Sequence, residues 1–213
     1  MSARTLQLGA AACAAALLAG CAASSAPEAA WEAKLQPLNA TVIDSQTTGQ
    51  ARFVQRGNTL DIDIQVDGAP ASITHWQHFH GLADGGAATC PDLSADRNGD
   101  GIVDLLETEP MAGTTMVPFI RKPQSMDIPH GSYPTADADG HYHYQVSVPL
   151  DQLEAAFADA FPGQQLDLDK RVVFIHGVPD SIALPSSVQS LGPIPAQTTL
   201  PIACGVIEKA ALR

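Results

Sequence analysis

His78-Phe79-His80 places two imidazoles two residues apart in a stretch that predicts a β-strand. Side chains alternate across a strand, so both histidines lie on one face, close enough to hold one metal ion. His176 ends a second strand-like run, 171–176, and His75 lies just before the first pair. Three or four imidazoles drawn from two strands would form a copper or zinc site. The alternative interpretation is that these are ordinary core or surface histidines.

Residues 96–107 match the pattern of an EF-hand calcium loop, in which Gly101 permits the sharp turn. The expected oxygen ligands are Asp96, Asn98, Asp100, the backbone carbonyl of Val103, Asp104 and Glu107. Hard oxygen ligands in this number select calcium over softer metals. The chain has one such loop with a poor helix before it, so we expect a permanent structural ion and not a calcium sensor. The alternative is an acidic surface loop.

Residues 1–20 predict a secretory signal, because Arg4 precedes an apolar run that ends in Leu18-Ala19-Gly20-Cys21. This ending resembles the bacterial lipoprotein signal, in which the cysteine is acylated, so Cys21 is the expected lipidation site. The alternative is a plain cleaved signal. No other segment is long and apolar enough to span a bilayer, so we expect attachment to the membrane by the lipid alone.

Residues 21–34 are rich in Ala, Ser, Pro and Glu and predict a flexible tether, while 35–213 fits one domain. Asp and Glu number 23 against 11 Lys and Arg, and the net charge is -12. Such a surface excludes nucleic acid and anionic lipid as partners and is compatible with metal ions. We expect a location in the cell envelope, on the periplasmic side. Ala22 resembles the default routing to the outer membrane in an envelope with two membranes.

Short strand-like runs recur between Gly and Asp turns, and they predict an all-β antiparallel sandwich or barrel. The runs are 51–55, 59–66, 140–148, 172–176 and 202–207. In the second run Leu60, Ile62, Ile64 and Val66 are expected to face the core. Residues 151–161 have helical spacing and predict one short helix, capped by Asp151.

Two cysteines remain once Cys13 leaves with the signal and Cys21 carries lipid. An exported chain with two such cysteines joins them in an oxidising compartment, which predicts a Cys90–Cys204 disulfide. The bridge would tie the loop after His80 to the C-terminal strand.

Four stretches resemble the copper–zinc superoxide dismutase superfamily, a Greek-key β-sandwich. They are 75–81, which is similar to the family's His-x-x-His-x-His segment, the turn 135–140, the strand 172–176 and the C-terminal strand 203–207. Cys90 stands where the family's disulfide partner of the C-terminal cysteine is expected. The calcium loop resembles an insertion in bacterial lipoprotein-like relatives of this fold.

The resemblance implies that His78, His80 and His176 are copper ligands and that His75 orients His176 without binding metal. The family's histidine that bridges copper and zinc has no evident counterpart. His130 is a candidate to bind zinc, to complete the copper site, or to do neither, and we expect no ordinary zinc site. Where the enzyme has an arginine that attracts superoxide, this chain has Pro201, so we expect at best a slow dismutase.

His141 and His143 share a strand face and are a weak candidate for a secondary metal site, an exposed polar face being the alternative. Three functions follow from the sequence. The first is a lipid-anchored copper protein with weak superoxide dismutation, the second is copper sequestration without turnover, and the third is a structural module that uses calcium but no transition metal.

Overall fold

The computed structural model describes residues 26–44 and 46–212, which form nine strands and a few short helices. The predicted signal and Cys21 lie outside these residues. The strands are β1 (Ala29–Pro37), β2 (Thr48–Arg56), β3 (Thr59–Asp67), β4 (Trp76–Gly81), β5 (Thr114–Pro118), β6 (Tyr142–Pro149), β7 (Val172–His176), β8 (Pro201–Val206) and β9 (Glu208–Lys209). The α-helices are α1 (Ala40–Ile43), α2 (Leu105–Ala112), α3 (Leu150–Ala160) and α4 (Ala196–Thr199).

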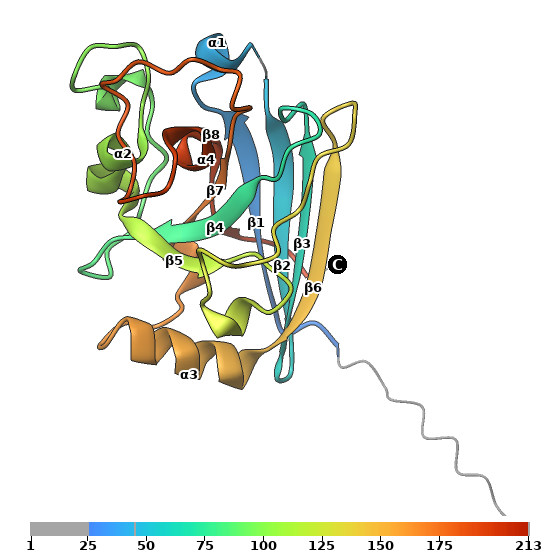
Figure 1. Cartoon of the computed structure of the whole chain (residues 1–213). Helices are drawn as coiled ribbons and strands as arrows, with labels where there is room; N and C mark the ends of the chain where they lie inside the picture. The colour runs from blue at the N-terminus through green and yellow to red at the C-terminus, as the bar shows by residue number, and fades with distance from the viewer. Residues whose placement is uncertain (1–25, 45, 213) are drawn as a thin grey trace, which may run out of the picture.

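The strands form an all-β, sandwich-like fold in which one layer holds β1, β2, β3 and β6 and the other holds β5, β4, β7 and β8 (Figure 1). Hydrogen bonding follows the order β5-β4-β7-β8-β1-β2-β3-β6, and β9 pairs with β1. Strand β1 belongs to both layers, because its body pairs with β2 while Gln36 and Pro37 pair with β8. The crossovers make β4 and β7 antiparallel neighbours, although they are far apart in sequence.

The main core lies between the layers and is built by alternation along the strands. Leu60, Ile62, Ile64 and Val66 of β3 are all buried in it, as the sequence predicts. Burial of each such side chain stabilises the fold by about 1.5–3 kcal/mol. The core fixes the register of the sheets, because a slip of one residue would turn this apolar row to water.

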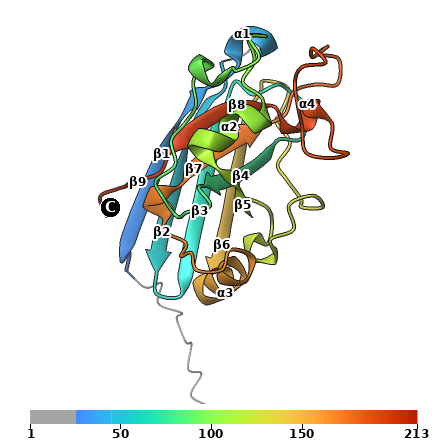
Figure 2. The same cartoon turned by 90° about the vertical axis from the view of Figure 1, so that its left-hand side faces the viewer.

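Helix α3 closes one end of the sandwich, with Leu153 and Phe157 buried and Phe161 packed against the core (Figures 1 and 2). The predicted helix is therefore confirmed, but its predicted cap is wrong. Pro149 occupies the N-cap position with no side-chain cap, and Asp151 already lies inside the helix. The proline's fixed backbone starts the helix directly at the end of β6.

The predicted flexible tether over 21–34 is wrong from Ala29 onward. Strand β1 begins there and pairs antiparallel with β2 from Ala29 to Leu35, with Ala30 and Ala33 buried. Alanine is a weak strand former, so the local composition gives little sign of this strand. Its pairing with β2 and β9 overrides the local preference.

A second, smaller core lies on the outer face of the β4–β7–β8 layer, under the segment that connects β4 to β5. It contains Phe174 and Cys204 from the sheet and Val103 and Ala112 from the covering segment. Figure 2 shows α2, which belongs to this segment, lying over the layer. The segment is therefore packed on the sheet and is not a free loop. None of the helices in residues 26–44 and 46–212 is long and apolar enough to cross a membrane.

Candidate metal centre

The centre is built on two neighbouring strands, β4 and β7. In their antiparallel register Trp76 faces His176 and His78 faces Phe174. Alternation sends Phe79 of β4 into the main core, so the histidines on either side of it point to the outer face. The covering segment then closes over them, which explains why polar side chains are buried there.

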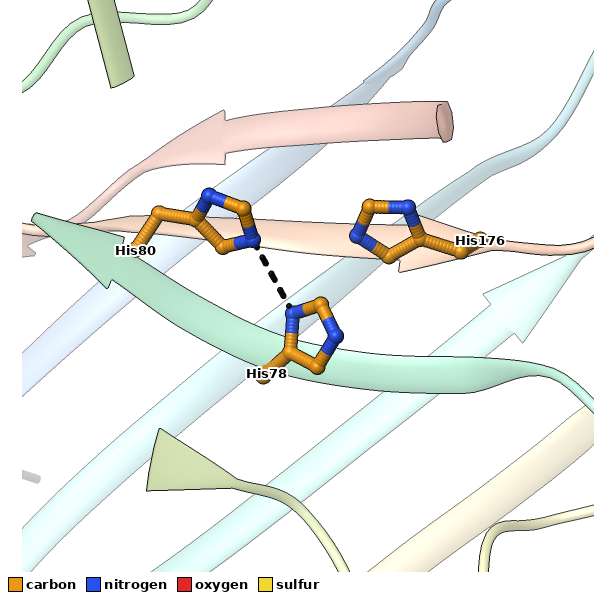
Figure 3. Close-up of side chains that lie close together, drawn as sticks. All are labelled: His78, His80 and His176. Atoms are coloured by element: carbon orange, nitrogen blue, oxygen red, sulfur yellow. Dashed lines mark hydrogen bonds between the residues drawn. The ribbon is translucent and has the colours of Figure 1, made fainter. Parts of the chain in front are cut away.

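The three predicted ligands His78, His80 and His176 meet at one place, as Figure 3 shows. One nitrogen from each ring lies within 4.8 Å of the others. His80 Nε2 is 3.2 Å from His78 Nδ1, and the ring centroid of His176 is 4.6 Å from that of His78. Of the residues that the structure describes, these are the only histidine, cysteine or acidic side chains gathered in this way.

Two backbone carbonyls set the orientation of two of the rings. The Nδ1–H of His80 donates to the carbonyl oxygen of Gly113 at 3.1 Å, and the Nδ1–H of His176 donates to that of Thr199 at 2.8 Å. Since a carbonyl can only accept, each ring carries its proton on Nδ1 and keeps the lone pair on Nε2. Both Nε2 atoms are therefore in the form that binds a metal.

Burial keeps these rings neutral. All three histidines are at most 3 % exposed. Burial lowers the pKa of His80 to about 3, with a further lowering from the neighbouring His176, and lowers the pKa of His176 to about 4. The pKa of His78 is also well below its usual range, first because of burial and then because of the other two rings. Neutral imidazoles bind metal without first releasing a proton.

His176 Nε2 is buried and has no hydrogen-bond partner. A buried polar atom without a partner is destabilising by roughly 1–3 kcal/mol, and such atoms are rare in native proteins. A metal ion with N–metal bonds of about 2.0–2.1 Å would satisfy it together with the two other rings. This buried cluster could therefore bind a metal, while imidazole donors alone suit zinc, copper, iron and nickel.

His75 lies behind the centre, fully buried, with Nδ1 3.1 Å from the carbonyl oxygen of His176 and Nε2 2.9 Å from that of Pro70. Burial lowers its pKa in spite of the two carbonyls, which raise it. Its ring packs against Tyr142 at 5.8 Å between centroids. His75 therefore contacts the backbone of a centre residue, the place expected for a positioning residue.

The remaining candidate histidines lie elsewhere. His130 is 81 % exposed and pairs with Asp127 at 3.0 Å, so it does not complete the centre. His141 pairs with Asp67 at 2.7 Å and His143 with Asp63 at 2.9 Å, both on the solvent face of β3 and β6. They belong to an exposed polar face, with Tyr142 and Tyr144 turned inward.

The predicted calcium loop is closed on itself by hydrogen bonds. Glu107 Oε1 accepts from the backbone N–H groups of Arg97 and Asn98 at 2.8 and 3.3 Å, and Asp96 accepts from those of Gly99 and Gly101. Gly101 has a φ of 85°, the left-handed backbone that the motif requires at this position. The other predicted ligands are engaged too, since Asn98 and Asp100 accept from backbone N–H groups and the carbonyl of Val103 accepts from Asn39.

Asp104 and Glu107, the last two predicted calcium ligands, also start α2. Asp104 accepts from Glu107 N–H and Glu107 from Asp104 N–H, which is a capping box. Helix α2 was not predicted, although the spacing of Asp104 and Glu107 is the signal for a capping box at its start. An ionised carboxylate has about four lone-pair sites, so these groups can accept the N–H bonds and still coordinate an ion.

The predicted Cys90–Cys204 disulfide is present, with Cα atoms 5.8 Å apart. It joins the segment that covers the histidines to β8, the neighbour of the strand that carries His176. The bridge therefore helps hold the cover of the centre in place.

Three contributors to the centre were not found from the sequence. They are Thr115, whose Oγ1 lies 3.1 Å from His80 Nε2, and the carbonyls of Gly113 and Thr199. A carbonyl leaves no trace in residue type. At Gly113 the residue type itself is the signal. Glycine is needed there because a Cβ would lie 2.0 Å from the carbonyl oxygen of Gly81.

A scan against protein-family models and a search of curated proteins found no match for this chain. The resemblance to the superoxide dismutase superfamily therefore stays a prediction. The structure itself shows an all-β, sandwich-like fold, the Cys90–Cys204 disulfide and a buried cluster of three histidines that could bind a metal.

Proposed function

We propose that this chain is a lipid-anchored copper-binding protein of the cell envelope, with the fold of the copper–zinc superoxide dismutase superfamily. The observation that carries the proposal is the buried meeting of three neutral imidazoles, one of which has an unpartnered nitrogen. Copper is favoured because it binds nitrogen sites more strongly than the other divalent first-row metals. The resemblance also matches His78, His80 and His176 to the family's copper ligands.

The chain's own residues would hold copper through one ring nitrogen of His78 and through the Nε2 atoms of His80 and His176. Copper, when bound, supplies one-electron redox chemistry. The carbonyls of Gly113 and Thr199 keep the rings oriented, and burial keeps them unprotonated. The packed cover over the outer face excludes bulk water from the ligands.

Superoxide turnover is proposed as a minor activity at most. No charged side chain of the residues that the structure describes lines the cavity next to the centre, and Pro201 stands where the resemblance places the arginine that attracts the anion. A net charge of -12 adds a repulsive field. These observations favour the second candidate function, which is copper sequestration at the envelope without turnover.

Calcium is proposed as a structural ion of loop 96–107. The support is the ligand pattern in the sequence and the positive φ of Gly99 and Gly101. The loop is part of the segment that covers the centre, so an ion there would stiffen that cover.

Metal analysis of the purified protein, followed by a superoxide dismutase assay of the copper-loaded form, tests the proposal. We expect one copper per chain and a rate far below that of an efficient dismutase. Stoichiometric copper with no turnover would select sequestration, whereas no copper uptake by the folded protein would leave only the structural module.

A further inference from the structure

A cavity of about 190 Å³ adjoins the histidine centre, and His78 and His176 form part of its wall. Its lining residues come from β4, β5 and β7, from α2, from the connection between β5 and β6, and from the stretch that follows β7. That stretch is held against the calcium loop, since Ser187 Oγ donates to Asp100 at 2.6 Å and the Gln189 N–H donates to Asp104 at 2.6 Å. The cavity is thus a built feature of the packed cover.

Its walls are mostly apolar. Trp76, Leu105, Ile128, Leu191 and Ile194 line it, together with three threonines. Within residues 26–44 and 46–212, the lining includes no lysine, arginine, aspartate or glutamate. A smaller hollow next to it, which shares Leu105 and Leu191, is lined by Glu109. The charged side chain in the wall of this neighbouring hollow is therefore negative.

These walls select against anions. An anion that enters would lose hydration without gaining a cationic partner, and burial of an unpaired charge is strongly unfavourable. Glu109 would add repulsion. An uncharged molecule loses little on entry and gains from burying its apolar surface against Trp76 and the aliphatic side chains.

The size of the cavity and its polar end further restrict the range of ligands that it can bind. An apolar cavity of about 150 Å³ holds benzene, so this one has room for a molecule with a single six-membered ring. At one end, the buried Nε2 atom of His176 has no hydrogen-bond partner. A hydrogen-bond donor of the ligand, or a ligand group bound to the metal, would lie at that end.

We propose that the cavity binds a small uncharged molecule, about the size of one six-membered ring, whose single nitrogen or sulfur donor atom faces the three-histidine centre. The role of the donor atom rests on the proposed copper site, whereas occupancy of the apolar cavity does not. The centre would therefore take neutral ligands in preference to small anions.

The test uses pyridine as the neutral probe and azide as the anion. In the copper-loaded protein at pH 7.5, electron paramagnetic resonance should show an added nitrogen ligand at pyridine concentrations at least tenfold below those at which azide changes the spectrum. In the metal-free protein, saturation-transfer NMR should show pyridine in contact with the protein, and Leu191→Trp, which fills the cavity, should abolish that transfer.

Leu191 offers a matched pair of charge variants, because it is 50 % exposed and Leu212, near the C-terminus, is 53 % exposed. The C-terminal stretch lies beside β1 and β2, where the Ala210 N–H donates to the Ala30 carbonyl and Arg52 donates to that of Ala211, and none of these residues lines the cavity. We expect Leu191→Lys to raise the affinity for azide about two- to fivefold, the range for a solvent-exposed charge pair. Leu212→Lys should leave it unchanged.

Two results would overturn the proposal. One is azide binding as tight as pyridine binding in the unaltered protein, and the other is the absence of saturation transfer to pyridine in the metal-free form. Saturation transfer without any copper signal would instead refute the proposed copper site and leave the cavity as an apolar binding site.

Discussion

Removing the Cys90–Cys204 disulfide should destabilise the protein strongly, because the bridge closes a very long loop. The two residues are 114 positions apart. In the chain-entropy treatment, closing a loop of that length stabilises the folded state by about 5 kcal/mol. Cys204 also lies in the small core under the cover, so a Cys90→Ala/Cys204→Ala variant keeps that site apolar while removing the crosslink.

Urea unfolding followed by tryptophan fluorescence measures this effect. We expect the double variant to lose about 4–5 kcal/mol of unfolding free energy. The unaltered protein in reductant should unfold at the variant's midpoint, and the variant should not respond to reductant. A loss below about 1 kcal/mol would refute the reasoning, since the unfolded chain would then gain little freedom when the bridge is removed.

Three further predictions concern the centre and its cover. The metal-free protein should lose stability as pH falls from about 6.5 towards 4, because the buried histidines have pKa values below that of an unfolded histidine and the unfolded state takes up the protons. The urea concentration at the unfolding midpoint should therefore fall with pH across this range. A midpoint that does not change with pH would contradict the burial of neutral rings. Excess calcium chelator should lower the melting temperature with little change in the circular dichroism spectrum. In a Glu107→Gln variant, the chelator should no longer lower the melting temperature. Identical melting curves with calcium and with chelator would rule out a stabilising ion. Gly113→Ala should destabilise the fold by more than about 1 kcal/mol, since the φ of Gly113 is 74° and the added Cβ would collide with the Gly81 backbone. Gly85→Ala is the matched control that separates this collision from backbone strain, because Gly85 has a φ of 75° and open space around it.

Local patterns in the sequence were sufficient to predict the strands that alternate clearly. Strand β3 reads as four buried aliphatic residues between polar ones, and β7 ends on the predicted histidine. Strand β1 was not predicted because its first residues are rich in alanine, a weak strand former, and because its position depends on partners distant in sequence. Helix α2 was not predicted from the sequence because the residues of its first turn were interpreted only as metal ligands.

The centre was predictable as a set of residues but not as a closed environment. Spacing two apart placed His78 and His80 on one face, and the strand-like run that ends at His176 added the third ligand, which the resemblance also implied. The carbonyls that orient the rings come from Gly113 and Thr199, and the walls of the apolar cavity come from six elements and connections of the chain. Such arrangements arise only when the cover packs on the sheet, so residue types alone do not specify them.

Copper titration of the protein and of single histidine variants tests the central claim most directly. Electron paramagnetic resonance of the copper-loaded protein should show one site with at least three nitrogen ligands. His78→Gln, His80→Gln and His176→Gln should each lose that signal or weaken binding by an order of magnitude or more, while His143→Gln, altered on the exposed face, should retain it. Tight copper binding with an unchanged spectrum in His80→Gln or His176→Gln would contradict the account.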